Sequence, residues 1–237
     1  MKRGKPLKRT KGVRPEQRRF LIYCEGACTE DQYFKGLRTD LRSLPVAICL
    51  GGEHGEPKSL VRAAIDHQER ASRSASDRWT EYDEVWCVID VEAPVPHDGL
   101  AAALKLARQH GVQVALTNPC FELWLLLHFK DISGYCTSAE AQRALERLDA
   151  CGYSVDRKHL EYESLRAGHG RAEQRAQALR ERTTKGYADN PWTDVDRLVG
   201  RLRAARYGGR PGGSGAGRPL TRSVVRPWRR PPVPRRP

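Results

Sequence analysis

Acidic side chains stand where short apolar segments of this chain end. Glu25 follows the apolar run Phe20–Cys24, and Asp90 and Glu92 end the run that begins at Glu84. At the end of a strand, a spacing of two lets Asp90 and Glu92 reach one ion, whereas adjacent residues would point to opposite faces. Carboxylates brought together repel unless a cation or protons neutralise them. Mg²⁺ suits such oxygen ligands, with Mn²⁺ as an alternative, and it keeps waters for a phosphate substrate. The expected chemistry is therefore metal-assisted reaction of a phosphodiester.

Four further polar residues could extend this site: Glu30, Asn118, Glu122 and Lys158. Each also has an ordinary structural explanation. Glu30 and Glu122 fall in the first turns of expected helices, where the helix dipole favours an acid. Asn118 could be only a helix cap, and Lys158 could either face a phosphate or simply point into solvent. The sequence leaves these alternatives open.

Alternating strand and helix signals must position these residues. The expected strands are Phe20–Cys24, Val46–Leu50, Glu84–Asp90 and Val112–Thr117. The expected helices are Glu30–Leu41 capped by Thr29, one capped by Ser59, Gly99–His110, Cys120–Phe129 after an Asn118-Pro119 cap, Ala139–Ala150, Ala167–Arg182 and Pro191–Arg203. This pattern predicts an α/β fold: a Rossmann-like parallel sheet of about four strands flanked by helices, with a helical C-terminal part. Right-handed crossovers would bring every β-to-α loop, and hence the acids, to the carboxyl edge of the sheet.

The charge of the chain is concentrated at its two ends. Of the formal net charge of +13, +8 lies in residues 1–19 and another +8 in residues 208–237, so residues 20–207 carry −3. We predict a basic disordered arm (1–18), a folded domain (19–206) and a tail rich in Pro, Gly and Arg (207–237). The slightly acidic middle argues against a basic nucleic-acid platform on the domain itself. The tail is either a solvated segment or an electrostatic tether to nucleic acid.

Composition also indicates the cellular compartment of the protein. No segment approaches the ~20 apolar residues that span a bilayer, and no apolar stretch of a signal peptide follows the basic start. The seven cysteines are odd in number, widely spaced and without a CxxC pair. Reduced cytosolic cysteines have this pattern, so we expect a cytoplasmic protein without a membrane partner or a zinc site.

Four segments resemble the RloB family: LIYCEGACTEDQYFKGL (21–37), YDEVWCVIDVE (82–92), NPCFELWLLLHF (118–129) and NPWTDVDRLVGRL (190–202). That family is found with bacterial restriction-modification and phage-defence loci and is similar to Toprim domains. The resemblance implies a Toprim-like fold in which Glu25 matches the glutamate after the first strand, a general acid or base. Asp90 and Glu92 match the metal-binding Asp-x-Asp pair, although Glu92 stands where Asp is usual.

The resemblance also implies a function. It points to a nuclease that cleaves DNA or RNA with Mg²⁺ in antiviral or abortive-infection defence, next to an ABC-type ATPase partner encoded nearby. The alternative is a non-enzymatic sensor or adaptor subunit of such a complex, which the replacement of Asp by Glu92 favours. The oligomeric state, including a homo-oligomer, is left open.

Overall fold

The computed structural model describes residues 17–73 and 81–205. The predicted N-terminal arm and C-terminal tail therefore lie almost entirely outside the described residues. The sheet has five strands in the order β2-β1-β3-β4-β5. Their bounds are β1 (Arg18–Cys24), β2 (Val46–Leu50), β3 (Glu84–Asp90), β4 (Gln113–Asn118) and β5 (Trp192–Thr193).

The first four strands are parallel, which confirms the predicted α/β class. The fifth strand corrects one prediction: residues 192 and 193 are not the first turn of a helix. They pair antiparallel with β4, with Thr193 opposite Thr117 and Trp192 opposite Asn118. The buried Thr117 and Thr193 hydroxyls also lie 3.0 Å apart across this pair. Pairing with a partner distant in sequence thus overrides the local helical pattern.

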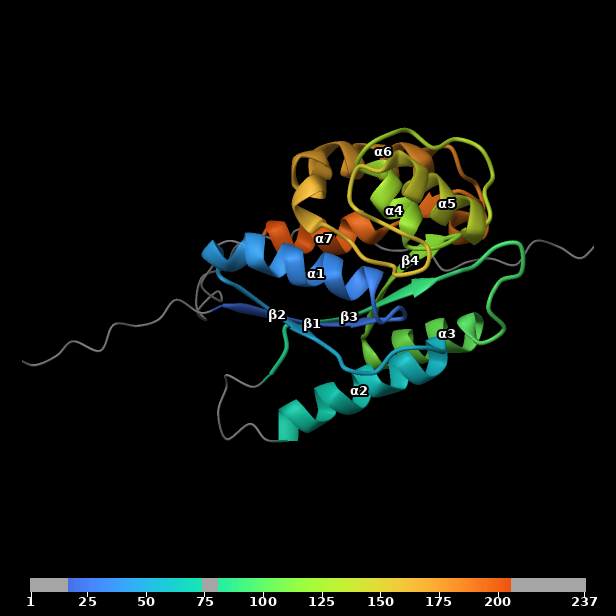
Figure 1. The fold of residues 1–237 in the computed structure, drawn as a ribbon. Coiled ribbons are helices and arrows are strands. Elements are labelled where there is room, and N and C mark those ends of the chain that lie inside the picture. The colour runs from blue at the N-terminus through green and yellow to red at the C-terminus, as the bar shows by residue number, and fades with distance from the viewer. Residues whose placement is uncertain (1–16, 74–80, 206–237) are drawn as a thin grey trace, which may run out of the picture.

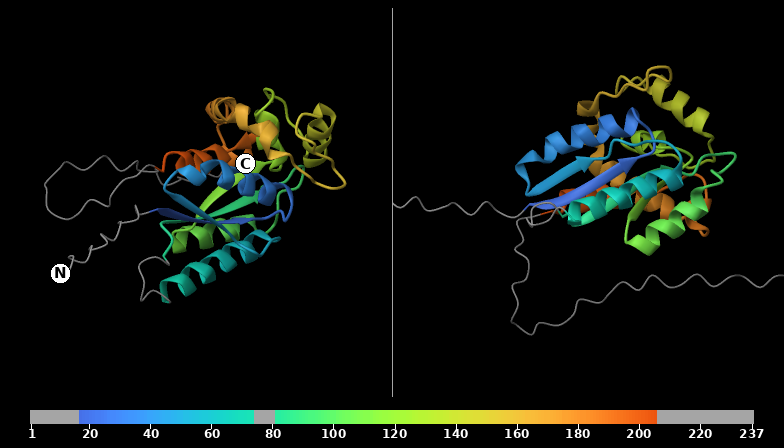
Figure 2. Two further views of the ribbon diagram at one scale, coloured as in Figure 1. Left: turned by 60° about the vertical axis from the view of Figure 1, so that its left-hand side comes forward. Right: turned by 90° about the horizontal axis from the view of Figure 1, so that it is seen from below.

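Two layers of helices enclose the sheet (Figure 1). Helices α2 (Pro57–Arg73) and α3 (Leu100–His110) cover one face. The other face carries the remaining helices, namely α1 (Thr29–Asp40), α4 (Glu122–Leu127), α5 (Ser138–Leu148), α6 (His169–Glu181) and α7 (Val195–Arg203). Short 3₁₀ segments are η1 (Leu41–Ser43), η2 (Tyr162–Gly168) and η3 (Gly186–Ala188). Figure 2 shows these layers from two further directions, with the C-terminal helices in yellow to red opposite α2 and α3.

Strand alternation divides the interior into two cores. Phe20 and Ile22 pack toward α1 and α4, whereas Leu21 and Tyr23 pack toward α2 and α3. In β3, Trp86 and Val88 belong to the first core. Because successive side chains of a strand point to opposite faces, Asp90 falls on the same side as these two, toward α1 and α4.

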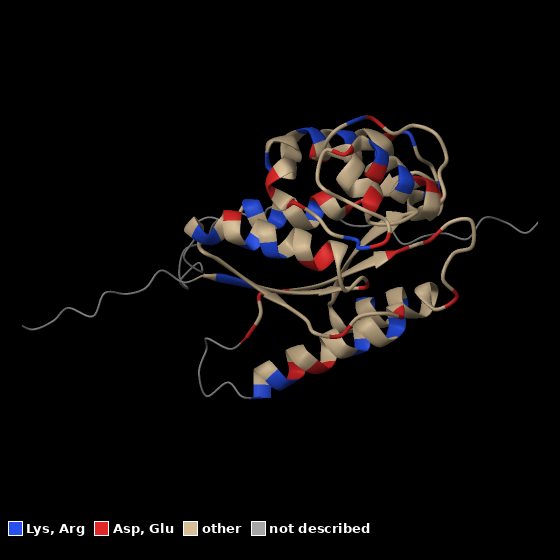
Figure 3. Cartoon of the chain, in the orientation of Figure 1, with Lys and Arg blue, Asp and Glu red and all other residues tan. Residues whose placement is uncertain are grey.

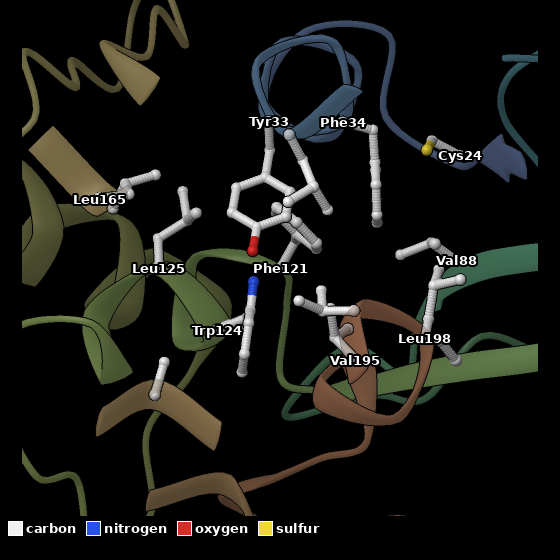
Figure 4. Packing of buried hydrophobic residues seen from close by; sticks show 14 of the residues in the cluster. Cys24, Tyr33, Phe34, Val88, Phe121, Trp124, Leu125, Leu165, Val195 and Leu198 are labelled. Carbon is white, nitrogen blue, oxygen red and sulfur yellow. The ribbon is translucent and has the colours of Figure 1, made fainter. Parts of the chain in front are cut away.

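Aromatic packing holds the start of α4 against α1 (Figure 4). The ring of Tyr33 in α1 lies 5.5 Å from that of Phe121 and 6.3 Å from that of Trp124, both in edge-on geometry. Phe34 and Phe121 pack beside them, with ring centroids 6.1 Å apart. All four side chains are essentially inaccessible to solvent. The first turns of α1 and α4, which carry Glu30 and Glu122, therefore form neighbouring parts of one core.

Three predicted helix caps are wrong. Helix α1 begins at Thr29 itself, whose hydroxyl is buried without a hydrogen-bond partner. Helix α2 begins before Ser59, and the Glu56 carboxylate accepts the Lys58 and Ser59 amides instead (3.1 and 2.8 Å). Helix α4 starts only at Glu122 with Phe121 at the N-cap position, so Asn118 does not cap it. The peptide bond between Asn118 and Pro119 is cis. Within the described ranges, no helix has the length and apolar character needed to cross a membrane.

Candidate active site

The carboxyl ends of β1 and β3 are joined through Glu25. Its Oε2 accepts a hydrogen bond from the backbone N–H of Asp90 at 3.0 Å. Its own backbone N–H donates to the carbonyl of Val88 at 3.1 Å, which continues the pairing of the two strands. The parallel register therefore fixes Glu25 directly beside Asp90, as the sequence predicts.

Asp90 carries an unsatisfied oxygen. Its Oδ1 is buried and has no hydrogen-bond partner. Burial raises the pKa of this carboxyl well above its usual range, and the charges of Glu30, Glu122 and Glu25 raise it further, while the Phe121 amide acts in the opposite sense. An oxygen of this kind can accept a proton or a cation, because nothing in the described residues satisfies it.

Glu30 is buried near this oxygen, and the backbone at Gly26 lies against its carboxylate. Its Oε1 accepts the N–H of Gly26 at 3.0 Å. A Cβ on Gly26 would collide with the Glu30 carboxylate, so the Glu-Gly sequence after β1 leaves the space that this side chain fills. Burial and the charge of Glu122 raise the pKa of Glu30, and Lys158 opposes them. Glu30 therefore belongs to the acidic site as well as to the first turn of α1.

Glu122 is the fourth acid of the group and only 4% of its surface is exposed. The hydroxyl of Tyr153 donates to its Oε1 at 2.7 Å. Burial and the nearby Glu122 charge raise the pKa of Tyr153, so this phenol stays a donor. We call Glu25, Glu30, Asp90 and Glu122 the acidic cluster. Figure 3 shows acidic segments in red at the start of α1 and at the strand ends beside α4.

Glu25 is the member of the cluster that titrates near neutrality. Partial burial raises its pKa to about 7, opposed by the hydrogen bond from Asp90 and assisted by the charges of Glu92, Glu30 and Glu56. A carboxyl with this pKa exists in both protonation states at physiological pH. That is the property expected of a general acid or base.

Glu92 lies at the rim of the cluster. Its side chain is exposed, and its backbone is left-handed with φ of 65°. Its N–H donates to the carbonyl of Pro119 at 2.9 Å. The strand geometry assumed for the Asp90/Glu92 spacing ends before Glu92, so the two side chains do not simply share one face. Glu92 nevertheless lies close enough to Glu25 to raise its pKa.

Lys158 and Asn118 occupy different surroundings. Lys158 is exposed, and its charge reaches Glu30; its backbone carbonyl accepts from Gln32 at 3.4 Å. Asn118 lies outside the acidic cluster: its Nδ2 donates to the Tyr187 carbonyl and its Oδ1 accepts from Asn190, both at 3.0 Å. Asn118 thus positions the chain at the end of β4.

Two parts of the site were not predicted from the sequence: the loop at His54 and Gly55, and Tyr153. His54 Nδ1 donates to the Cys24 carbonyl at 2.9 Å, and the N–H of Gly55 donates to the Glu25 carbonyl at 3.0 Å. The topology could have indicated this loop, because it follows β2 at the same edge of the sheet. Tyr153 lies in an irregular segment, and no periodic signal marks it.

The donor chemistry of the cluster fits a hard divalent cation. All four side chains offer carboxylate oxygens, and the buried Oδ1 of Asp90 lacks a partner. In the part of the chain that the structure describes, however, no three His, Cys, Asp or Glu side chains are already gathered as a metal-binding group. The residues present match the ion in chemistry, but their carboxylates do not converge on a single point.

These features define an α/β protein whose mostly parallel sheet carries an acidic site at its carboxyl edge. Residues 20–202 match the family described as RloB-like protein, and the chain belongs to that family. No curated protein and no solved structure matches the chain.

Proposed function

We propose that this protein is a metal-dependent nuclease that cleaves phosphodiester bonds of DNA or RNA. The observation that carries the proposal is the buried, unpartnered Oδ1 of Asp90, set among three other carboxylates at the carboxyl edge. Natural folds keep such like charges together where a ligand neutralises them, and strongly perturbed acids cluster at functional sites. The carboxyl edge is also where open parallel sheets bind ligands.

Asp90, Glu25 and Glu92 would hold Mg²⁺ or Mn²⁺, with Glu30 and Glu122 behind Asp90. When bound, the ion would stabilise the negative charge that develops on the phosphate oxygens. Glu25 can take up or release a proton near pH 7, so we assign it the proton transfer to or from the reacting oxygen. Lys158 remains a candidate for contact with the phosphate.

The proposed setting is antiviral or abortive-infection defence in the cytoplasm, together with an ABC-type ATPase encoded nearby. Membership of the RloB-like family supports the setting. The seven unpaired cysteines support a reducing compartment.

Cleavage of plasmid DNA and of RNA by the purified protein with Mg²⁺ or Mn²⁺ tests the proposal. We expect activity that EDTA removes and that Asp90→Asn and Glu25→Gln each reduce by at least ~100-fold. Asp98→Asn is the matched control, because this exposed acid lies on the loop after β3 outside the cluster. Activity that survives the Asp90→Asn and Glu25→Gln substitutions together would remove the assignment.

A non-enzymatic adaptor is the second candidate. The exposed Glu92 with its left-handed backbone favours it, because this residue lies at the rim of the cluster. Calorimetric titration with Mg²⁺ separates the two functions. Heat of binding that Asp90→Asn abolishes supports the nuclease, whereas no binding at millimolar Mg²⁺ together with tight association to the neighbouring ATPase supports the adaptor.

A further inference from the structure

Large exposed hydrophobic side chains gather at one edge of the molecule. Among the described residues, three such side chains are more than a third exposed: Val95 (72%), Tyr135 (61%) and Tyr187 (37%). Val95 lies on the loop after β3, and the two tyrosines lie on segments attached to the end of β4. Two of the three are tyrosines, whose rings offer an apolar face and a polar tip for contact with a ligand.

A pair of asparagine side chains holds both tyrosine segments in place. Asn190 accepts the N–H of Cys136 at 3.0 Å and donates to the carbonyl of the same residue at 2.8 Å, directly after Tyr135. It also donates to Asn118, which in turn donates to the carbonyl of Tyr187, both at 3.0 Å. The Tyr187 ring packs edge-on against Trp192 with centroids 6.5 Å apart. Hydrogen bonds of Asn118 and Asn190 therefore join the two segments that carry the tyrosines.

A polar pocket of about 300 Å³ lies between the same two segments. Its lining includes Ser133, two residues before Tyr135, and Arg182, Thr183, Thr184 and Asn190 on the segment around Tyr187. Its one acid, Asp189, already accepts the amides of Thr184 and Lys185 at 2.9 and 2.7 Å. The exposed Arg182 and Lys185 form no ion pair within the described residues. The lining of the pocket thus combines the hydroxyl groups of Ser133, Thr183 and Thr184 with the cation of Arg182.

The surface lies close to the acidic cluster. Asp90 pairs in register with Thr117, and Thr117 pairs with Thr193, one residue after Trp192. Two strand spacings place the backbone of Thr193 roughly 10 Å from that of Asp90. Tyr187 packs against Trp192, so its segment lies at the same edge of the sheet as Asp90.

We propose that Tyr135, Tyr187 and the pocket between their segments bind unpaired bases, so that the ligand is single-stranded nucleic acid. This inference rests on the proposed function for the presence of nucleic acid at the edge. Aromatic faces accept any base by stacking, while Arg182 and Lys185 attract the phosphates. Bases within a duplex are already stacked on their neighbours and do not present their faces to these rings.

Fluorescence anisotropy with labelled oligonucleotides in EDTA measures binding without cleavage. Single-stranded DNA, single-stranded RNA and a duplex of the same sequence are the three probes. We expect either or both single strands to bind more tightly than the duplex. Tyr135→Ala and Tyr187→Ala should each weaken single-strand binding by about 5- to 150-fold, the effect of losing one stacked base.

Two controls separate stacking from other effects. Val95→Ala removes exposed apolar surface from the same edge without removing a ring, and Tyr187→Phe keeps the ring; both should bind as the native protein does. Tyr135 is the more exposed tyrosine, so its replacement leaves the fold intact even if Tyr187→Ala disturbs the packing on Trp192. Native-like single-strand binding by both alanine variants, or duplex binding as tight as single-strand binding, overturns the inference.

A parallel cleavage assay with Mg²⁺ keeps the two proposals distinguishable. Cleavage by the native protein, combined with unchanged binding by the alanine variants, contradicts the base-binding surface alone. Tyrosine-dependent binding without any cleavage contradicts the nuclease and supports the surface.

Discussion

At the level of single residues, the acidic cluster opposes folding. Asp90 has a buried oxygen without a partner and three acids near it, so its ionised form is poorly stabilised by the protein alone. Residues placed for function commonly lower the stability of the fold in this way, so replacing them can raise stability while activity is lost. If Asp90 has a functional role, its replacement should leave stability unchanged or raise it; if it has a structural role, its replacement should lower stability.

We predict that Asp90→Asn abolishes metal-dependent activity and leaves the unfolding temperature unchanged or higher by up to about 4 °C, because an amide removes one charge from the cluster. Calorimetry with and without Mg²⁺ checks this, and the native protein should gain stability from the ion while the variant does not. Asp98→Asn should behave as the native protein in both measurements. A large loss of stability in Asp90→Asn would instead make Asp90 a structural residue.

Two buried histidines predict sensitivity to acid. Burial lowers the pKa of His128 to about 3 and that of His169 to about 4. Both pKa values lie below that of an unfolded histidine, so the unfolded state binds more protons between about pH 6.5 and pH 4. Their contribution to stability is complete above pH 6.5 and is lost as the pH falls through that window.

His128→Phe tests this effect, because phenylalanine keeps a ring among Tyr33, Trp124 and His169 and cannot be protonated. Between pH 7 and pH 5, the native protein should lose roughly 2 kcal/mol more stability than the variant. Urea unfolding at each pH measures the difference. Parallel pH profiles for the two proteins would contradict a buried neutral His128.

At the level of elements, α6 offers a matched pair of glycines. A Cβ on Gly168, just before α6, would approach the backbone oxygen of His128 to 2.6 Å, whereas a Cβ on Gly170 meets nothing within 4 Å. We predict that Gly168→Ala destabilises the fold by about 1–3 kcal/mol, because α6 must move away from the end of α4. Gly170→Ala should stabilise the helix by up to ~1 kcal/mol. Denaturant unfolding of both variants checks the prediction, and equal effects would contradict this packing.

The elements also show what the sequence could and could not predict. The strands from β1 to β4 are apolar runs that end at an acid, at a glycine or, for β4, at Asn118-Pro119, so the parallel sheet and the meeting of Glu25 with Asp90 followed from local pattern and topology. Strand β5 has two residues and exists only through pairing with β4, so no local signal predicted it. The contact between Tyr153 and Glu122 joins residues 31 positions apart through an irregular segment. The predicted shared face of Asp90 and Glu92 was wrong, because the left-handed backbone of Glu92 depends on the turn that follows β3.

At the level of the whole molecule, the acidic domain and the basic C-terminal tail have separable roles in the proposed function. Residues 208–237 contain eight Arg and no acid, and the described core ends before them. We predict that removing this segment leaves the unfolding temperature unchanged but lowers the affinity for nucleic acid. The affinity should also depend less steeply on salt, since each phosphate contact contributes ~0.7–0.9 to the slope of log K against log salt concentration. Binding titrations over a range of salt concentrations measure the change. An unchanged slope would contradict a tethering role.

The return of the chain to the sheet at β5 has a consequence for how the protein is made. The last acid of the cluster is Glu122, so all four acids are synthesised before α7, whose buried side chains include Leu198 and Leu202. Arg180 binds this segment through the carboxylate of Asp196 and the carbonyl of Thr193, and Arg201 pairs with Glu84 at the start of β3. Until these residues arrive, the outer edge of β4 is open and the core beneath the acids is incomplete. A nascent chain therefore carries every acid of the cluster well before the core that positions these acids is complete.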